Sequence, residues 1–255
     1  MGIYLMATLS SLVSSGGGSA TLETVILTKS QTWTPPVNGT GIIHVIGAGA
    51  SGGGDGNTRA GGAGGYSRKA VTFATGTNWT IVVGAGGTPT ATNQAVIAGG
   101  NSTAADGSSS LTANGAATSG YGGTASGGDV NFTGGTGGQS TTGGGGAVGV
   151  FANGSTTVSI SGGQTTDANG GADSFLVLGL GQLIGGSGGG SGGGNGGFLS
   201  GGGNNTDGAA QTYISGGKGG IGGGGGMGFS SNGSSLRVGG AGGDGLVVIQ
   251  YLTVT

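Results

Sequence analysis

Glycine runs spaced by threes constrain this chain more than any other feature of its sequence. Clear examples are residues 61–66, 134–139 and 216–227, in which two bare backbone positions often accompany each side chain. Glycine loses more conformational freedom on folding than any other residue, so such runs fit a folded chain only where backbone approaches something closely. The nearest candidate for that neighbour is another stretch of the same chain.

Disorder is the main alternative, because glycine-rich chains without a strict period are often low-complexity segments. Glycine supplies 75 of the 255 residues, yet there are only six Lys plus Arg and eight Asp plus Glu. Such a chain has too little charge to keep itself expanded in water. Collagen is excluded, because glycine is not held at every third position and there are three prolines. We therefore expect a folded chain.

Charge and cysteine content remove several classes of function. The net charge is −2 and the basic residues are scattered, which disfavours a nucleic-acid partner. The absence of cysteine excludes disulfides and thiolate metal sites. No stretch approaches the roughly 18 apolar residues of a membrane-spanning helix, so membrane insertion is not expected. The sequence gives no reason to expect a cofactor or a metal.

Strand-forming residues gather near the two ends of the chain. These runs are rich in β-branched and aromatic residues and are bounded by Gly, Asn or Pro. The runs are 22–28, 41–46, 67–73, 79–83 and 246–251. They predict an all-β fold, a small antiparallel β sandwich resembling a jelly roll, with almost no α-helix. Residues 8–13 are long enough for one helical turn or two.

The same pattern predicts three parts of the chain. Residues 1–21 form an N-terminal attachment arm. Residues 22–112 and 244–255 form a β platform, with the last strand pairing with the first ones. Residues 113–243, which carry most of the glycine runs, form a glycine-rich bundle inserted into that platform.

The bundle is expected to consist of polyproline II helices. In 216–227 the third positions are Lys218, Ile221, Gly224 and Met227. Polyproline II has three residues per turn and a rise of about 3.1 Å, which predicts a rod of roughly 37 Å with its side chains on one face. The rods lack internal hydrogen bonds, so their backbone groups must pair with neighbouring rods or water.

Bulky side chains interrupt the glycine-rich part of the sequence. They either fill gaps between rods or sit on tip loops that touch a partner, since connections on rigid scaffolds often carry binding residues. The candidate partner-contact residues are Phe151, Phe175, Phe198, Leu199, Tyr213, Ile214 and Phe229.

Two conventional motifs fail when they are read in context. Residues 47–52 fit the G-x-G-x-x-G of dinucleotide sites, but that motif needs a following helix and an acidic residue about 20 positions later. Glycines 53 and 54 follow instead, and residues 70–73 hold no acid. His44, the single histidine, lies within an apolar strand and is interpreted as structural. Asp167 and Asp173 are a weak carboxylate pair, so no catalytic residue is predicted.

The order of these pieces resembles a known family. The resemblance rests on residues 33–36 leading into 42–49, then 61–67, 76–87 and the ending 239–251. Together they are similar to the glycine-rich domain of bacteriophage tail-fibre and virion appendage proteins. A weaker likeness is to the distal tail-fibre adhesins of T-even-type phages, whose glycine-rich helices pack into a lattice and whose loops contact the host receptor.

This resemblance implies a non-enzymatic phage virion protein on the particle exterior. The arm would bind other virion proteins, and the tip loops would bind a host surface glycan or outer-membrane protein. By analogy we expect a homo-oligomer, with a trimer favoured. The alternatives are a purely structural decoration or fibre-base protein, and an ice-binding glycine-rich protein. Lys218, Ile221 and Met227 on one rod face disfavour ice binding.

Overall fold

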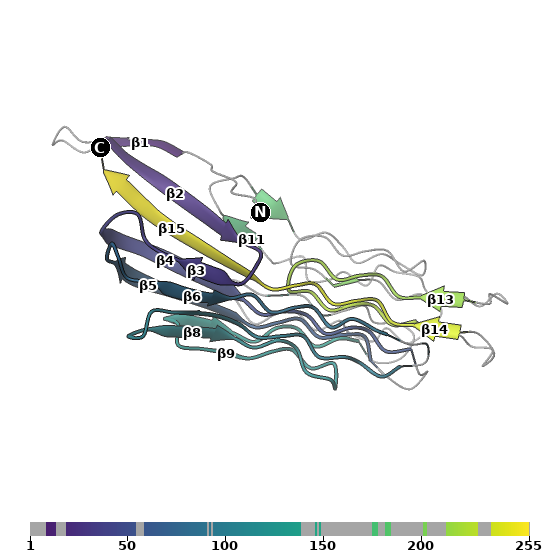
Figure 1. Ribbon diagram of the computed structural model, residues 1–255. Coiled ribbons are helices and arrows are strands. Elements are labelled where there is room, and N and C mark those ends of the chain that lie inside the picture. Colours follow the sequence, from purple (N-terminus) through teal and green to yellow (C-terminus); the bar gives the residue numbers. More distant parts are fainter. Residues whose placement is uncertain are drawn as a thin grey trace.

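Two antiparallel β-sheets and a glycine-rich array make up the described part of the protein (Figure 1). The computed structural model describes residues 9–13, 19–54, 59–90, 92, 94–138, 146, 148, 175–177, 182–184, 201–202, 213–228 and 236–254. These residues contain strands but no helix, as the sequence predicted.

A six-stranded sheet and a five-stranded sheet form the platform. The first runs in the order β1 (Leu9–Val13), β2 (Ser19–Leu27), β15 (Leu246–Val254), β4 (Gly39–Ile46), β5 (Tyr66–Phe73), β10 (Val130–Phe132). The second runs in the order β3 (Gln31–Trp33), β6 (Trp79–Val82), β7 (Ser102–Ala105), β8 (Ser110–Ala113), β9 (Ala125–Ser126). Two short pairs lie apart from them: antiparallel β11 (Phe175–Val177) with β12 (Gln182–Ile184), and parallel β13 (Tyr213–Ser215) with β14 (Leu236–Val238).

The last strand pairs with early strands, as predicted from the sequence. β15 lies between β2 and β4 and is antiparallel to both. In β4, Ile43 and Val45 point into the sandwich and lie opposite Ile249 and Val247 of β15. This alternation follows from the two-residue period of a strand, which sends neighbouring side chains to opposite faces.

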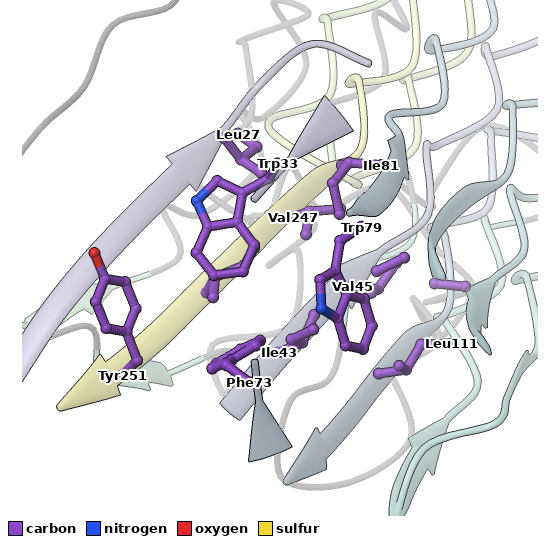
Figure 2. Close-up of a cluster of buried hydrophobic side chains, with 13 residues drawn as sticks. Leu27, Trp33, Ile43, Val45, Phe73, Trp79, Ile81, Leu111, Val247 and Tyr251 are labelled. Carbon is purple, nitrogen blue, oxygen red and sulfur yellow. The ribbon is translucent and has the colours of Figure 1, made fainter. Parts of the chain in front are cut away.

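Aromatic side chains from both sheets form the centre of the sandwich core (Figure 2). Phe73 of β5 makes edge-to-face contacts with Trp33 of β3 and Trp79 of β6, with ring centroids 5.1 and 6.0 Å apart. It also meets Tyr251 of β15 edge-on. Such pairs contribute beyond the burial of their area, and here they join the two sheets directly.

The six-stranded sheet is also buried on its outer face, on the side next to the glycine array. Ile46, Tyr66, Leu246 and Val248 form a second apolar cluster there, joined by Val148. Burial on both faces explains why β4 and β15 have nearly continuous apolar sequences where they approach the array.

The array is built around residues 47–54, which continue directly from β4 and are buried throughout. We call this segment the central rod. Every third N–H group of the central rod donates to the same antiparallel segment, so its N–H groups bind three neighbouring segments in turn. Gly47, Ala50 and Gly53 donate to residues 59–65; Ala48, Ser51 and Gly54 donate to 94–100; Gly49 and Gly52 donate to 240–243. Three residues per turn without internal hydrogen bonds is the polyproline II pattern.

Three further segments donate to the carbonyls of the central rod. They are 84–87, 114–116 and 223–228, through Gly87, Ala116, Gly225 and Gly228. The six neighbours also bond to one another in the cyclic order 59–65, 223–228, 239–245, 84–87, 94–100, 114–117. The central rod is therefore enclosed by a ring of hydrogen-bonded backbone.

Residues 216–227 do not form the single rod that was predicted. Gly222 has φ +68°, and the N–H of Gly223 donates to the carbonyl of Gly220. The chain reverses there, and the N–H of Gly226 donates back to Gly217. Met227 is buried, while Lys218 is exposed on the preceding segment, so these two side chains do not share a rod face. A turn that requires positive φ is the physical reason, because glycine adopts it without strain.

The described array uses residues on both sides of the predicted boundary at 113. Its central rod and the segments 59–65, 84–90 and 94–100 precede residue 113. Conversely, β9 and β10 follow residue 113 but pair with β8 and β5 of the platform. Platform and array thus alternate along the chain rather than following one another.

Residues 9–13 form strand β1, not the helical turn considered from the sequence. β1 pairs antiparallel with β2 within the six-stranded sheet, with Leu12 opposite Ala20. The β-branched and leucine side chains at the end of this short segment suit an edge strand, and the partner strand supplies the hydrogen bonds that a helix would have made internally.

Close backbone packing predicts a large cost for adding one methyl group to the central rod. A Cβ at Gly49 would lie less than 3.0 Å from backbone atoms of Gly223 and Gly224. We expect Gly49→Ala to lower the free energy of unfolding by about 3 kcal/mol or more, since backbone cannot swing away as a side chain can. The measurement is denaturant unfolding of the purified chain.

Gly76→Ala is the matched control. Gly76 has φ +83° in an open turn, and a Cβ there meets nothing within 4 Å. It should cost only about 1 kcal/mol, the strain of a left-handed residue. Equal losses in the two variants would contradict backbone close packing as the source of stability.

Candidate functional site

Four of the predicted partner-contact residues lie outside the described residues: Phe151, Phe198, Leu199 and Phe229. Phe175 lies in β11, and Tyr213 and Ile214 lie in β13, where the structure describes the strands but not these side chains. β13 pairs in parallel with β14 at the end of the array opposite the two sheets (Figure 1). The predicted residues 213 and 214 are thus at the far end of the array.

We call this region the distal end and define it by Gly53, Gly54, Arg59, the turn 117–121, and β14. Gly53 follows Ile46 of β4 by seven residues, which corresponds to roughly 22 Å along a polyproline II rod. Its N–H donates to the carbonyl of Arg59, where the chain starts back toward β5. The turn 117–121 reverses another rod, with φ +76° at Gly120. Reversals of the chain therefore collect far from the platform.

An arginine and a tyrosine stack on each other at this distal end. The guanidinium carbon of Arg59 lies 4.7 Å from the centroid of the Tyr121 ring. The Tyr121 side chain is 53% exposed. A guanidinium over an aromatic face is held by cation–π attraction, so both groups are positioned before any ligand arrives.

A second arginine, Arg237, lies just before the segment 239–245. That segment is separated from the segment 59–65 by 223–228 in the ring around the central rod. The backbone carbonyl of Arg237 lies against Gly54, where a Cβ would come within 2.6 Å of it. Between the two arginines, the segment 223–228 ends with the N–H of Gly228 donating to Gly53. Leu236, beside Arg237 in β14, is 47% exposed. The distal end therefore combines two cations with exposed apolar surface.

Acidic side chains of the described residues lie elsewhere. Glu23 is on β2, Asp106 is in the turn after β7, Asp129 directly precedes β10, and Asp244 nearly adjoins β15. Asp244 is tied to the array through the backbone N–H of Gly86, at 2.8 Å. Within the part of the chain that the structure describes, negative charge thus concentrates at or near the platform.

His44 is held in a buried hydrogen-bonded group on the outer face of the six-stranded sheet. It is 6% exposed, with Nδ1 2.8 Å from the Tyr66 hydroxyl and Nε2 3.2 Å from Oε1 of Gln250. The amide oxygen can only accept, so Nε2–H donates to it, and the Tyr66 hydroxyl donates to Nδ1. Burial raises the pKa of Tyr66 to about 12, which keeps this donor protonated. Both ring nitrogens are occupied, which fits the structural interpretation of His44.

The residues of the G-x-G-x-x-G match form most of the central rod. Their N–H groups donate to carbonyls of neighbouring segments and the whole match is buried. A dinucleotide site needs these N–H groups free to approach a pyrophosphate. The glycines here serve contact between backbones instead.

Sequence reasoning did not single out Arg59 and Tyr121. A usable signal was present, because Tyr121 and Thr124 are three residues apart in the glycine-rich stretch 120–124 and both are exposed. With a three-residue period, such a pair marks the outward ridge of a rod. Which residue of another rod lies beside that ridge depends on pairing between distant segments, which the sequence alone does not reveal.

The fold and the array define a class of protein: an all-β, glycine-rich module in which a sandwich carries hydrogen-bonded polyproline II segments. The chain belongs to the family described as Glycine-rich domain, which matches it over residues 24–252. A search of curated proteins finds no significant match. The residues that the structure describes contain no helix long and apolar enough to cross a membrane.

The buried state of His44 predicts a pH dependence of stability. Burial lowers its pKa from 6.5 to about 4, with Arg68 adding to the decrease and Gln250 opposing it. The unfolded chain therefore takes up this proton first as pH falls. The contribution of neutral His44 to the free energy of unfolding should be fully present above pH 6.5. The free energy of unfolding should then decline by roughly 3 kcal/mol as the pH approaches 4.

Urea unfolding between pH 4 and 7 measures this decline. In His44→Gln the decline over that interval should be largely gone, whatever the overall stability of the variant. An unchanged pH slope in His44→Gln would show that other groups cause it.

Proposed function

We propose that this chain is a non-enzymatic phage virion protein, a tail-fibre or appendage module that presents its distal end to the host surface. The observation that carries the proposal is the separation of its two ends. The sandwich, with the N-terminal strand β1 at its edge, lies at one end, and the chain reversals around Arg59 and residues 117–121 lie at the other. Residues 1–21 attach the module to other virion proteins, and the module works as a homo-oligomer, a trimer by analogy.

Rigidity of the array supports this role. In the central rod, every N–H from Gly47 to Gly54 donates a hydrogen bond to one of three neighbouring segments. Bending the array would break many of these buried bonds at once, each of which is costly to leave unmade. A stiff spacer holds its end loops in fixed positions, which lowers the entropy that binding would otherwise cost.

The experiment compares two changes in virions that carry the chain. Exchanging residues 198–215 for the corresponding segment of a relative should reduce adsorption or change host range, because the described end of this segment, β13, is at the distal end. Deleting residues 1–8, which precede strand β1 of the six-stranded sheet, should instead remove the chain from the particle, as detected by an antibody in negative-stain images.

The structural alternative predicts a different pair of results. If the chain only decorates or stiffens the particle, the exchanged virions will adsorb normally, and deletion of residues 1–8 will leave fragile or incomplete particles. Normal adsorption after the exchange would therefore count against adhesion.

One observation favours a second function, ice binding. Ala85 and Thr88 are exposed on one rod, and Ala95 and Ala98 are exposed on the next. These rods are adjacent, since the N–H of Gly100 donates to the carbonyl of Ala85. The sequence argument against ice binding placed Lys218 and Met227 on one rod face. That argument is weaker, because the buried Met227 and the exposed Lys218 are on separate segments.

Thermal hysteresis of the purified chain tests this second function. An ice-binding face would give measurable hysteresis that disappears when Thr88 and Ala98 are replaced by lysine. Hysteresis no greater than that of an unrelated protein at the same concentration would dismiss it.

A further inference from the structure

We propose that the hydrogen-bonded group around His44 makes the contact between the platform and the array sensitive to acid. When His44 takes up a proton, the turn at Gly222 separates from the outer face of the six-stranded sheet while the sandwich core stays folded. This inference goes beyond the proposed function, because it concerns how the two parts of the molecule are joined.

His44 lies close to the place where three strands of the platform pass into the array (Figure 1). β4, which carries His44, continues directly into the central rod. Tyr66 is the first residue of β5 and follows the segment 59–65, whereas Gln250 is on β15, which follows the segment 239–245. The contacts of His44 with Tyr66 and Gln250, 2.8 and 3.2 Å long, therefore join the three strands near the start of their rods.

Beside this group, residues from outside the two sheets cover the outer face of the six-stranded sheet. Ile46 and Tyr66 share an apolar cluster with Val148, and Ile221 packs against it. Gly222 belongs to the same contact, because a Cβ there would lie within 2.7 Å of the Ile46 and Val148 side chains. We call these five residues the outer contact. The histidine is two residues before Ile46 on β4 and so faces the same side of the sheet.

The neutral form of His44 fits this site and the charged form does not. In the neutral ring, Nε2–H donates to Gln250 and Nδ1 accepts from the Tyr66 hydroxyl. Protonation places a second N–H at Nδ1, where the hydroxyl hydrogen of Tyr66 already points, so this hydrogen bond must rearrange. A buried cation also lacks the hydration that water gives it, and the outer contact must open to restore it.

Among the described residues, the titratable groups that face His44 are Tyr66 and Arg68, both on β5. Arg68 lies opposite His44 in the register of β4 and β5, so it repels a charged ring. On the other side, Val248 of β15 lies opposite His44, with Ile26 of β2 beyond it. β10, next to β5, carries no titratable side chain. No carboxylate on these strands compensates the charge.

The proton on His44 is therefore bound less tightly in the closed form than in an open one. Burial lowers the pKa of His44 to about 4, with Arg68 adding to the decrease and Gln250 opposing it, whereas a hydrated ring has its ordinary value of 6.5. The closed form keeps its full stability above pH 6.5 and loses it as the pH falls toward 4. The ratio of open to closed molecules should rise about twentyfold between pH 7 and pH 5.

Amide hydrogen exchange of the full-length chain, followed by NMR, tests the inference, with each rate compared with its intrinsic rate at the same pH. The reporters are the N–H groups of Gly64 and Gly222, which donate to the carbonyls of Gly222 and Asp244. Their protection should fall about twentyfold between pH 7 and pH 5, while amides of β6 and β7 keep theirs. In His44→Gln, protection of the two glycines should change less than about twofold, because no group titrates there.

Gln250→Glu keeps the histidine and reverses its preference. The new carboxylate lies beside Nε2, stabilises the charged ring and raises the pKa of His44. The change in protection between pH 7 and pH 5 should then fall below about threefold. Gln31→Glu is the matched control, because it makes the same change at an exposed position of β3 and should keep the twentyfold response.

Three results would overturn the inference. An equal response in the unmodified chain and His44→Gln would assign the response to another group. Parallel loss of protection in β6 and β7 would show that the whole chain unfolds rather than the outer contact alone. An undiminished response in Gln250→Glu would show that the charge on His44 does not open the contact. Virion adsorption after exchange of residues 198–215 is a separate measurement, so none of these results decides the proposed function.

Discussion

Hydrogen bonds between backbones of different segments are the interaction on which this structure depends. A polyproline II rod makes none internally, so a buried rod is possible only when its neighbours accept every N–H and donate to its carbonyls. The central rod meets this condition through six neighbours. Glycine follows as a consequence, because at Gly49 and Gly52 a Cβ would collide with the carbonyls of Gly223 and Gly226. Where the central rod carries a side chain instead of glycine, that side chain has a neighbour to pack against: Ala50 packs with Val96 and Ala116.

The sandwich makes this array possible by fixing where the rods start. β4 passes into the central rod at Gly47, β5 receives the segment that ends at Gly65, and β15 begins after Gly245. Aromatic contacts around Phe73 set the relation of the two sheets, and hence the relation of the rods that leave them. The core supplies ordinary hydrophobic stabilisation, whereas the array has few side chains to bury and relies on polar pairing of its backbone. A loss of sheet packing should therefore loosen both parts together.

Sequence reasoning found what depends on local pattern and missed what depends on long-range pairing. β-branched runs gave β4, β5 and β15 nearly to their ends, and the three-residue phase gave polyproline II geometry. The turn at Gly222 was missed because its neighbours, apart from Ile221, are glycines, which are compatible with both a straight rod and a reversal. β1 was ambiguous because a short edge segment takes its hydrogen bonds from β2, a partner invisible in its own residues. Likewise, nothing near Arg59 in the sequence indicates that Tyr121 lies over its guanidinium.

Building a scaffold from backbone has a consequence for where function can reside. In an ordinary core, side chains both stabilise the fold and limit what can change, but here the buried positions are largely fixed as glycine or alanine by contact distance. Side chains that face outward along a rod, such as Thr88 or Tyr121, are under no such limit, because only every third residue faces a given direction. A fold of this kind can therefore vary an outward-facing side chain such as that of Tyr121 while it keeps the backbone hydrogen bonds that hold the array together.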